Sequence, residues 1–369
     1  MASISAATMK DQLLTLEDVY ARLGETEPLV ETKFSMNGTL APTFTLPDGW
    51  NVGLKPASGM LETEATVTVD GKEFSLTKDA ILEATSSIGL TKDYVCKTPG
   101  GLVQQHVNYW FQHADRDMKL LSTNDKGLAF TKAKITPFSN IALLDRAVDS
   151  IGNKYGKNAE IYADYKFHHD LRRTAIRLIV PEYTKVITSA RHTAEKPDEW
   201  STGIQIRNSI IGETMLEMQG YLFAWWCTNG AISTHSETGS YAFNRRTQAQ
   251  DDVYAWARNS VDEILGGLEH EFESVQQLTE VQLGEDINDV LADLFQQYKI
   301  APEAREGIIE RLIASDDLTM YGMMNAVTAA ANSDSLSDTI RTSLMEVGGD
   351  LPRSTAARCA ACHRLGVGH

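Results

Sequence analysis

The sequence predicts an α+β protein: an antiparallel sheet of four or more strands packed with helices, followed by an α-helical C-terminal region with one long helix. Two observations carry this prediction. Between about residue 30 and residue 245, apolar and polar residues alternate in several short segments, as half-buried strands require. After Arg245-Arg246 the apolar residues recur every three or four positions, which is the period of an amphipathic helix.

The composition is that of a globular protein, with 369 residues of which 42% are hydrophobic and 23% charged. The 34 Lys+Arg against 50 Asp+Glu give a net charge of −16, which excludes a generally basic nucleic-acid coat. Any contact with nucleic acid would therefore come from a local basic patch. No apolar run approaches the roughly 18–20 residues of a membrane span, and four cysteines fit a reducing cytoplasm. The start of the chain shows no secretion signal.

Changes of pattern divide the chain into four parts. Residues 1–24 form an N-terminal helix, 25–245 an α+β domain with a strand-rich core at about 158–227, 246–347 a helical region, and 348–369 a tail. The first helix is indicated by apolar residues from Leu13 to Leu23 near helical spacing, closed by Gly24. Asp70-Gly71 favours a hairpin turn, and Thr77 is a suitable N-cap for a helix that starts at Lys78.

The middle of the chain predicts an antiparallel sheet. Segments 161–168, 174–180, 203–207 and 215–223 are the expected strands. In the second of these, Ile176, Leu178 and Val180 share the face that should meet the core, whereas Arg173 and Arg177 project from the other face.

The C-terminal third predicts one long helix and several short ones. Apolar residues from Val253 to Leu278 fall on one stripe, which indicates a helix of about 30 residues and about 45 Å. Shorter helices are expected at about 285–299, 302–314, 319–331 and 336–347, and the tail from Gly348 shows no clear period.

Common phosphate-binding and hydrolase motifs are absent from the sequence. It contains neither Gly-x-x-x-x-Gly-Lys-Ser/Thr nor a strand-linked Gly-x-Gly-x-x-Gly, and neither His-Glu-x-x-His nor Gly-x-Ser-x-Gly. Catalytic groups can come from distant positions, so these absences lower the expectation of an enzyme without excluding one, and no catalytic residue is assigned.

The C-terminal tail carries the clearest local pattern of metal ligands. Cys359 and Cys362 have the spacing with which two thiolates hold one Zn²⁺, and His363 or His369 could complete the site. Two tails could also share one metal ion in an oligomer. Haem attachment, which shares the Cys-x-x-Cys-His pattern, is rejected because the chain has no export signal. A redox dithiol, or a disordered tail with two incidental cysteines, remains an alternative.

The densest positive stretch lies on and around the predicted hairpin. Its residues are Lys154, Lys157, Lys166, His168, His169, Arg172, Arg173 and Arg177. Cationic side chains with interleaved aromatic rings can follow a phosphate backbone while the rings stack on bases. The contacts expected on this basis are Lys166, Arg172, Arg173 and Arg177, with Tyr162 or Tyr165 stacking. The alternative is a solvated sheet face balanced by neighbouring acids.

Three stretches resemble a known family. They are Arg207-Asn208-Ser209-Ile210-Ile211-Gly212, Trp226-Cys227-Thr228-Asn229-Gly230 and Tyr321-Gly322-Met323-Met324-Asn325-Ala326-Val327-Thr328. Together they resemble the phage/plasmid-like proteins, a domain-of-unknown-function group that includes the YafZ-type prophage proteins, over roughly residues 150–345. The resemblance implies a protein of a phage, plasmid or prophage that acts inside a bacterial host, in DNA metabolism or counter-defence.

Three function hypotheses follow from these patterns. The first is a non-enzymatic protein that binds single-stranded nucleic acid in phage recombination or replication. The second is an oligomeric assembly or counter-defence protein, in which the helical region and the acidic surface bind a host protein. The third is a metal-dependent enzyme using acid pairs such as Asp251-Asp252 or Asp316-Asp317, although acids at predicted helix starts are explained by the helix dipole. A homo-oligomer is expected, and a membrane partner is not.

Overall fold

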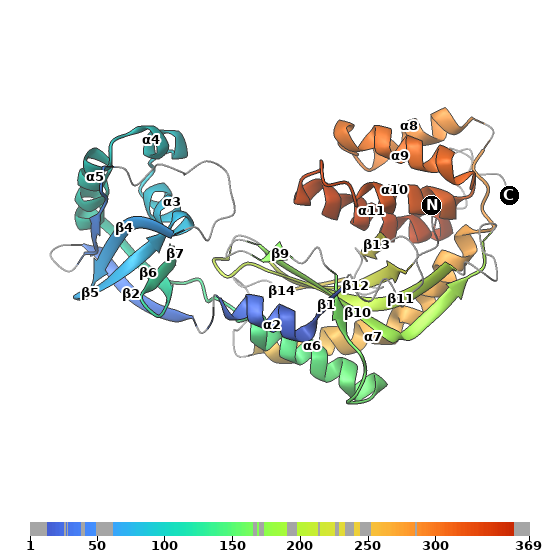
Figure 1. Cartoon of the computed structure of the whole chain (residues 1–369), viewed down its shortest axis with the longest axis horizontal. Helices are drawn as coiled ribbons and strands as arrows, with labels where there is room; N and C mark the ends of the chain where they lie inside the picture. The colour runs from blue at the N-terminus through green and yellow to red at the C-terminus, as the bar shows by residue number, and fades with distance from the viewer. Residues whose placement is uncertain are drawn as a thin grey trace.

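The computed structural model describes residues 13–25, 27, 29–37, 41–48, 62–164, 168–169, 173–189, 198–212, 215–225, 229–232, 240–243, 252–284 and 286–357. It confirms the α+β class, with a C-terminal helical region that includes a helix of 26 residues. The strands form two separate sheets, which lie in two bodies (Figure 1).

The first body contains a six-stranded mixed sheet. Its strands are β2 (Val30–Asn37), β3 (Thr43–Thr45), β4 (Glu62–Val69), β5 (Lys72–Thr77), β6 (Ala114–Thr123) and β7 (Lys126–Lys132), in the order β2-β6-β7-β5-β4-β3. Three helices pack with it: α3 (Lys78–Ser87), α4 (Lys92–Lys97) and α5 (Gly100–His113). Asp70 and Gly71 both have positive φ, as the predicted hairpin turn requires. The Thr77 hydroxyl accepts a hydrogen bond from the Ala80 amide at 3.2 Å, which confirms the predicted N-cap.

The second body is built on an eight-stranded antiparallel sheet, here called the large sheet. Its strands are β1 (Leu14–Thr15), β8 (Tyr162–Ala163), β9 (His168–His169), β10 (Thr174–Ile187), β11 (Asp198–Asn208), β12 (Leu216–Ala224), β13 (Asn229–Ile232) and β14 (Ser240–Phe243). The path is β1-β8-β10-β11-β12-β13, with β9 paired to β10 and β14 to β12. The predicted antiparallel sheet in the middle of the chain is therefore present, and it is larger than the sequence indicated.

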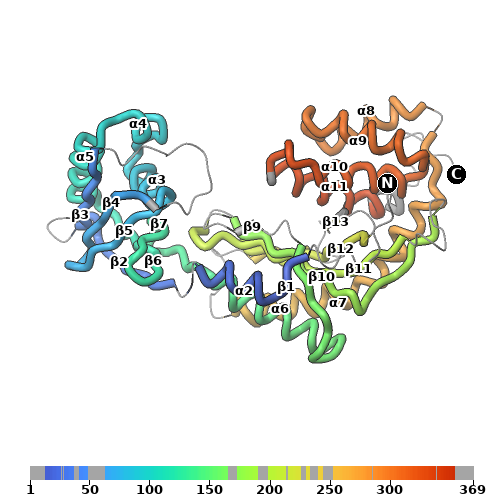
Figure 2. The backbone as a smooth tube through the Cα atoms, viewed as in Figure 1, coloured from blue at the N-terminus to red at the C-terminus, as the bar shows by residue number. Residues whose placement is uncertain are grey.

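Helices cover both faces of the large sheet (Figures 1 and 2). On one face lie α2 (Leu16–Gly24), α6 (Asn140–Tyr155) and α7 (Val253–Leu278), and Ile176, Leu178 and Val180 pack against them as predicted. On the other face lie α8 (Ile287–Gln297), α9 (Pro302–Ser315), α10 (Met320–Ala330) and α11 (Asp338–Ala357). The apolar stripe of α7 is buried within the chain, its N-terminal part against the sheet and α6 and its C-terminal part in the apolar cluster that also contains α10 and α11.

The first helix and β1 belong with the large sheet, although more than a hundred residues separate them from β8, the next strand of that sheet along the chain. α2 begins with a capping box between Thr15 and Asp18, and it packs on α6 and β8. Residues 25–245 thus contain strands of both sheets. A small apolar cluster joins the bodies, with Leu121, Leu128 and Ala129 packed on Ile210 and Ile211.

The last helix continues past its predicted end at residue 347 to Ala357. Gly348 and Gly349 indicated a helix end, but in the structure they allow α11 to approach β13 closely. A Cβ atom on Gly349 would lie 2.0 Å from the carbonyl oxygen of Ile232. Leu351 follows within the same apolar core, which explains why the helix continues. In the described residues, no helix has the length and apolarity that crossing a membrane demands.

Leu268→Ala tests whether the apolar stripe of α7 packs in the core of a single chain. Leu268 is 2% exposed, so we expect its truncation to lower the free energy of unfolding by about 2–5 kcal/mol. The matched control is Ile313→Ala on α9, where a side chain that is 72% exposed should change stability by less than about 0.5 kcal/mol. Urea denaturation measures both values. An unchanged stability together with a lower oligomer mass would instead place this stripe between chains.

Candidate functional site

A row of polar side chains crosses the large sheet beneath α11. Arg177 on β10 lies directly opposite Gln205 on β11, Gln205 opposite Gln219 on β12, and Gln219 opposite Ser240 on β14. Directly opposite residues of antiparallel strands point to the same face of a sheet. The register therefore places four polar side chains from four strands side by side, and we call this set, with Asp164, the polar row.

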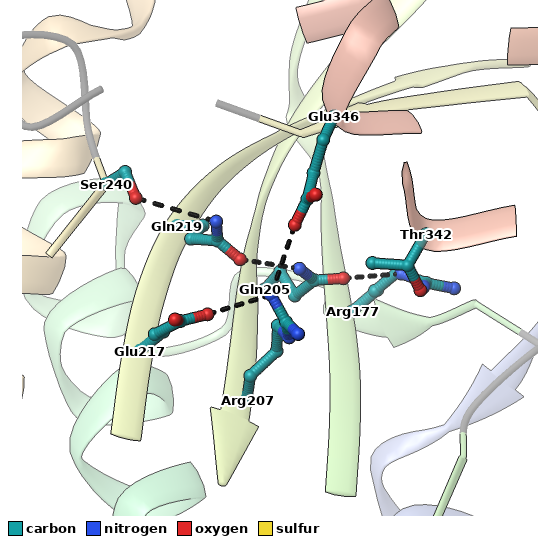
Figure 3. Close-up of polar contacts among 8 residues, drawn as sticks. All are labelled: Arg177, Gln205, Arg207, Glu217, Gln219, Ser240, Thr342 and Glu346. Atoms are coloured by element: carbon teal, nitrogen blue, oxygen red, sulfur yellow. Dashed lines mark hydrogen bonds and ion pairs between the residues drawn. The ribbon is translucent and has the colours of Figure 1, made fainter. Parts of the chain in front are cut away.

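Hydrogen bonds connect the polar row in one direction (Figure 3). The Nε of Arg177 donates to Oε1 of Gln205 at 2.7 Å, and Nε2 of Gln205 donates to Oε1 of Gln219 at 2.7 Å. Nε2 of Gln219 then donates to the Ser240 hydroxyl at 3.5 Å. Each glutamine accepts with its oxygen and donates with its nitrogen, so the guanidinium sets the orientation of both amides.

At the Arg177 end of the polar row, Asp164 supplies a negative charge. Oδ2 of Asp164 lies 3.7 Å from Nη1 of Arg177, and it accepts a hydrogen bond from the Tyr221 hydroxyl at 3.1 Å. Asp164 is 2% exposed and Arg177 is 5% exposed. A single charge buried to this extent would cost several kcal/mol, so each of the two requires the other.

A second arginine connects the sheet to α11. Nη1 of Arg207 on β11 lies 2.9 Å from Oε2 of Glu217 on β12 and 3.1 Å from Oε1 of Glu346 on α11. Burial raises the pKa of Glu346, and the nearby Glu217 carboxylate acts in the same direction, whereas Arg207 opposes them. The two carboxylates thus share one guanidinium, and α11 is attached to the sheet through charge as well as apolar contact.

The N-terminal half of α11 also meets the arginines through hydroxyl groups. Arg173 donates from Nη1 to the Thr339 hydroxyl at 3.1 Å, and Arg177 donates from Nη2 to the Thr342 hydroxyl at 3.5 Å. With Glu346, these residues recur every three or four positions and so share one helix face. α11 therefore presents a polar face to three arginines on two neighbouring strands.

The predicted nucleic-acid contacts fall into different environments. Arg173 is exposed at the start of β10, but Arg177 is buried in the polar row and α11 covers it. The sequence placed Arg177 on the face opposite Ile176, as observed, but indicated a solvent-facing surface there. Such exposure is not observed, because the helical region packs on that face. Lys166, Arg172 and Tyr165 lie outside the described residues.

Tyr162 does not lie beside Arg173. It pairs with Ile179, six residues along β10 from Arg173, which corresponds to about 20 Å along the strand. Its ring is partly buried against the apolar core under the helical region. A strand that contacts Arg173 would therefore not stack on Tyr162 at the same nucleotide. Arg207, which the sequence did not single out as a contact, is nearer to Arg173 on the polar face, and its side chain is 33% exposed.

The predicted metal ligands Cys359, Cys362, His363 and His369 lie outside the described residues. Among the residues that are described, no group of three His, Cys, Asp or Glu side chains could hold a metal ion.

Of the acid pairs proposed for an enzyme, Asp316-Asp317 has a local role, whereas Asp252 makes no side-chain cap hydrogen bond at the start of α7 and Asp251 lies outside the described residues. Asp317 accepts hydrogen bonds from the amide and the hydroxyl of Thr319, which is the N-cap of α10. Asp316 ends α9 in the left-handed conformation, with φ of 53°. Both residues thus shape the turn between α9 and α10.

Several residues that carry the family resemblance make structural contacts, whereas residues 226–228 lie outside the described residues. Asn208 is 1% exposed, and its Nδ2 donates to the Phe138 carbonyl at 3.0 Å and to Oδ1 of Asn140 at 2.7 Å. Gly212 has φ of 76° in the turn after β11. Thr328 on α10 is buried next to Gly348 of α11. These motif residues make structural contacts around the large sheet.

Comparison of the chain with protein-family models, with curated proteins and with solved structures found no match.

Glu346→Gln tests the electrostatics of this site through pH. Because its folded pKa is raised, the folded protein holds this proton more tightly than the unfolded chain, and stability falls as pH rises above the ordinary value of 4.5. The variant loses this dependence, so its unfolding free energy relative to the wild type should increase between pH 4.5 and neutral pH.

Glu269→Gln is the matched control, measured by the same denaturation series. The contact with Lys185 lowers the pKa of Glu269, so the stability that this group gives the wild type is lost as pH falls. The unfolding free energy of Glu269→Gln relative to the wild type should therefore decrease as pH rises, opposite to the change expected for Glu346→Gln. Identical pH trends for the two variants would contradict the assignment.

Proposed function

We propose that this chain is a non-enzymatic protein of a phage or another mobile element that binds single-stranded nucleic acid in the bacterial cytoplasm, in recombination or replication. One observation supports the proposal most directly: Arg173, Arg177 and Arg207 share one face of two neighbouring strands. Guanidinium groups held at fixed positions suit the bidentate recognition of phosphate.

The three arginines would have different roles in binding. Arg173 is exposed and would contact phosphate directly, together with Lys166 and Arg172 on the same predicted hairpin. Arg207 is partly exposed and shared between two carboxylates, so its contact with phosphate would be weaker. Arg177 is a positioning residue, because its guanidinium orients the polar row beneath α11. Tyr165, which lies on the hairpin predicted from the sequence, is the remaining candidate for base stacking.

The test is fluorescence anisotropy with labelled single- and double-stranded DNA at two salt concentrations. We expect the wild type to prefer single strands and to bind less tightly at higher salt. Arg173→Glu should weaken binding and lower the salt slope by about 0.7, the loss of one phosphate contact on a single strand.

Lys97→Glu is the control for a general change of charge. Lys97 lies on α4 of the first body, its side chain is 77% exposed and it pairs with Asp93 four residues earlier. This variant should bind like the wild type. Undetectable or salt-independent binding of the wild type would overturn the proposal.

A second candidate function rests on the distribution of charge. Residues 252–353 contain 20 acidic and 6 basic residues, so −14 of the net charge of −16 lies in the helical region. Such a surface fits a basic host protein, as an assembly or counter-defence role requires. The stripe of α7 is already used within the chain, so the partner would meet the outward sides of the short helices. Absence of DNA binding at either salt would favour this candidate.

We also propose that the tail holds zinc through Cys359 and Cys362, with His363 or His369 completing the site. Metal analysis of the purified full chain should find one zinc per chain, or one per two chains if two tails share the ion. Cys359→Ser combined with Cys362→Ser should remove it, whereas Cys96→Ser, a change in the first body, should not. A wild-type chain without zinc would favour incidental cysteines in the tail.

A further inference from the structure

Helix α5 has an outward face without any charge. Its sequence, GGLVQQHVNYWFQH, contains no Lys, Arg, Asp or Glu in 14 residues, on a chain in which 23% of the residues are charged. The inward face buries Gly100, Val103, Val107 and Phe111, and α5 packs on β2 and β3. The composition of the outward face is therefore not explained by the core of the first body.

Aromatic rings gather on this outward face. Leu102, Tyr109 and Trp110 are 49%, 56% and 48% exposed, which makes three of the eight exposed large hydrophobic residues in the described part of the chain. His106 and His113 lie beside them, on the same helix. We call these five residues the aromatic face.

Contacts among the rings hold the aromatic face in place. Tyr109 stacks on His113 with 4.3 Å between ring centroids, and Trp110 meets the Tyr109 ring edge-on at 5.7 Å. Tyr94 on α4 stacks on His106, and its hydroxyl lies 2.7 Å from Nδ1 of that ring. Rings that are ordered before binding lose little conformational entropy on association, which is why Tyr and Trp are frequent at the centres of protein interfaces.

We propose that the aromatic face of α5 is a dimerisation surface that binds the same face of a second copy of this chain. The distribution of charge favours a second copy of this chain as the partner. Residues 29–137 contain 11 basic and 12 acidic residues, whereas residues 252–353 carry a charge of −14. Two copies of a chain with net charge −16 repel each other least when they meet through the nearly neutral first body. An uncharged face avoids placing like charges directly opposite each other across the two-fold axis.

Nucleic acid is the less suitable occupant of the aromatic face. Sites that bind single strands combine stacking rings with positive charge that follows the backbone. α5 supplies no Lys or Arg, and Lys97 on the neighbouring helix α4 is paired with Asp93 at 3.0 Å. The salt dependence separates the two occupants, because salt screens the repulsion between acidic copies but weakens contacts to phosphate.

The size of the surface predicts a reversible dimer. A helix of 14 residues is about 21 Å long, so two crossed α5 helices bury less than the about 800 Å² per partner of a standard interface. α5 lies at the outer end of the first body, away from the large sheet (Figure 1). The dimer would therefore leave the exposed Arg173 accessible, and the inference does not rest on the proposed nucleic-acid binding.

Sedimentation velocity of the full chain over a range of protein concentrations tests the proposal. The wild type should form a dimer as concentration rises, and higher salt should strengthen it. Tyr109→Ala combined with Trp110→Ala should weaken dimerisation by at least about 30-fold, the effect of losing a hot spot. Because both side chains are exposed, the variant should keep the wild-type unfolding temperature.

Ile313→Ala is the matched control, since it removes an exposed apolar side chain from α9 in the acidic region. It should leave dimerisation unchanged. Hydrogen exchange of the wild type gives a measurement that needs no variant: amides of residues 100–113 should gain protection at high protein concentration. A wild type that stays monomeric would overturn the proposal. Equal effects of the two variants on dimerisation, or protection that appears only in segments other than α5, would overturn it as well.

Discussion

Arg177 lies in the large sheet with helices on both faces, and its guanidinium has to be paired there. Asp164 supplies the charge on one side and Gln205 the acceptor on the other. A shift of the strand register by one residue would unpair the guanidinium and also turn Ile176 and Leu178 toward the polar row. The pairing of the Arg177 guanidinium therefore specifies the register of β8, β10 and β11. The hydrogen bond from Gln205 to Gln219 specifies the register of β12 in the same way.

The same arginines determine how the helical region sits on the sheet. Thr339, Thr342 and Glu346 of α11 contact Arg173, Arg177 and Arg207, whereas Gly348 and Gly349 bring the helix close to β13. Leu344, Met345 and Leu351 then join the apolar core. Helix α11, which covers the polar row, is thus attached to the sheet by polar contacts near its N-terminus and by apolar packing near its C-terminus.

Charge divides the molecule between its two bodies. The helical region carries most of the negative charge, and its helix α11 packs on the sheet face that contains the arginines, where Glu346 pairs with Arg207. The first body is nearly neutral and carries the aromatic face of α5 at its outer end. Binding of phosphate at Arg173 and association through α5 would use separate surfaces, and neither would require the other to rearrange.

Local patterns were sufficient for the elements themselves. The alternation around Ile176, the stripe from Val253 to Leu278, the turn at Asp70-Gly71 and the cap at Thr77 each depend on neighbours within a few residues, and the sequence alone determined them. The burial of Arg177 depends on Thr342, 165 positions later, and the helix predicted to end at residue 347 continues to Ala357 past Gly349, which lies close to Ile232 on β13. A polar residue on a strand has the same pattern whether it faces water or a distant partner. Only the tertiary structure decides between them, because the pairing that makes burial of a charge favourable comes from segments far apart in the chain.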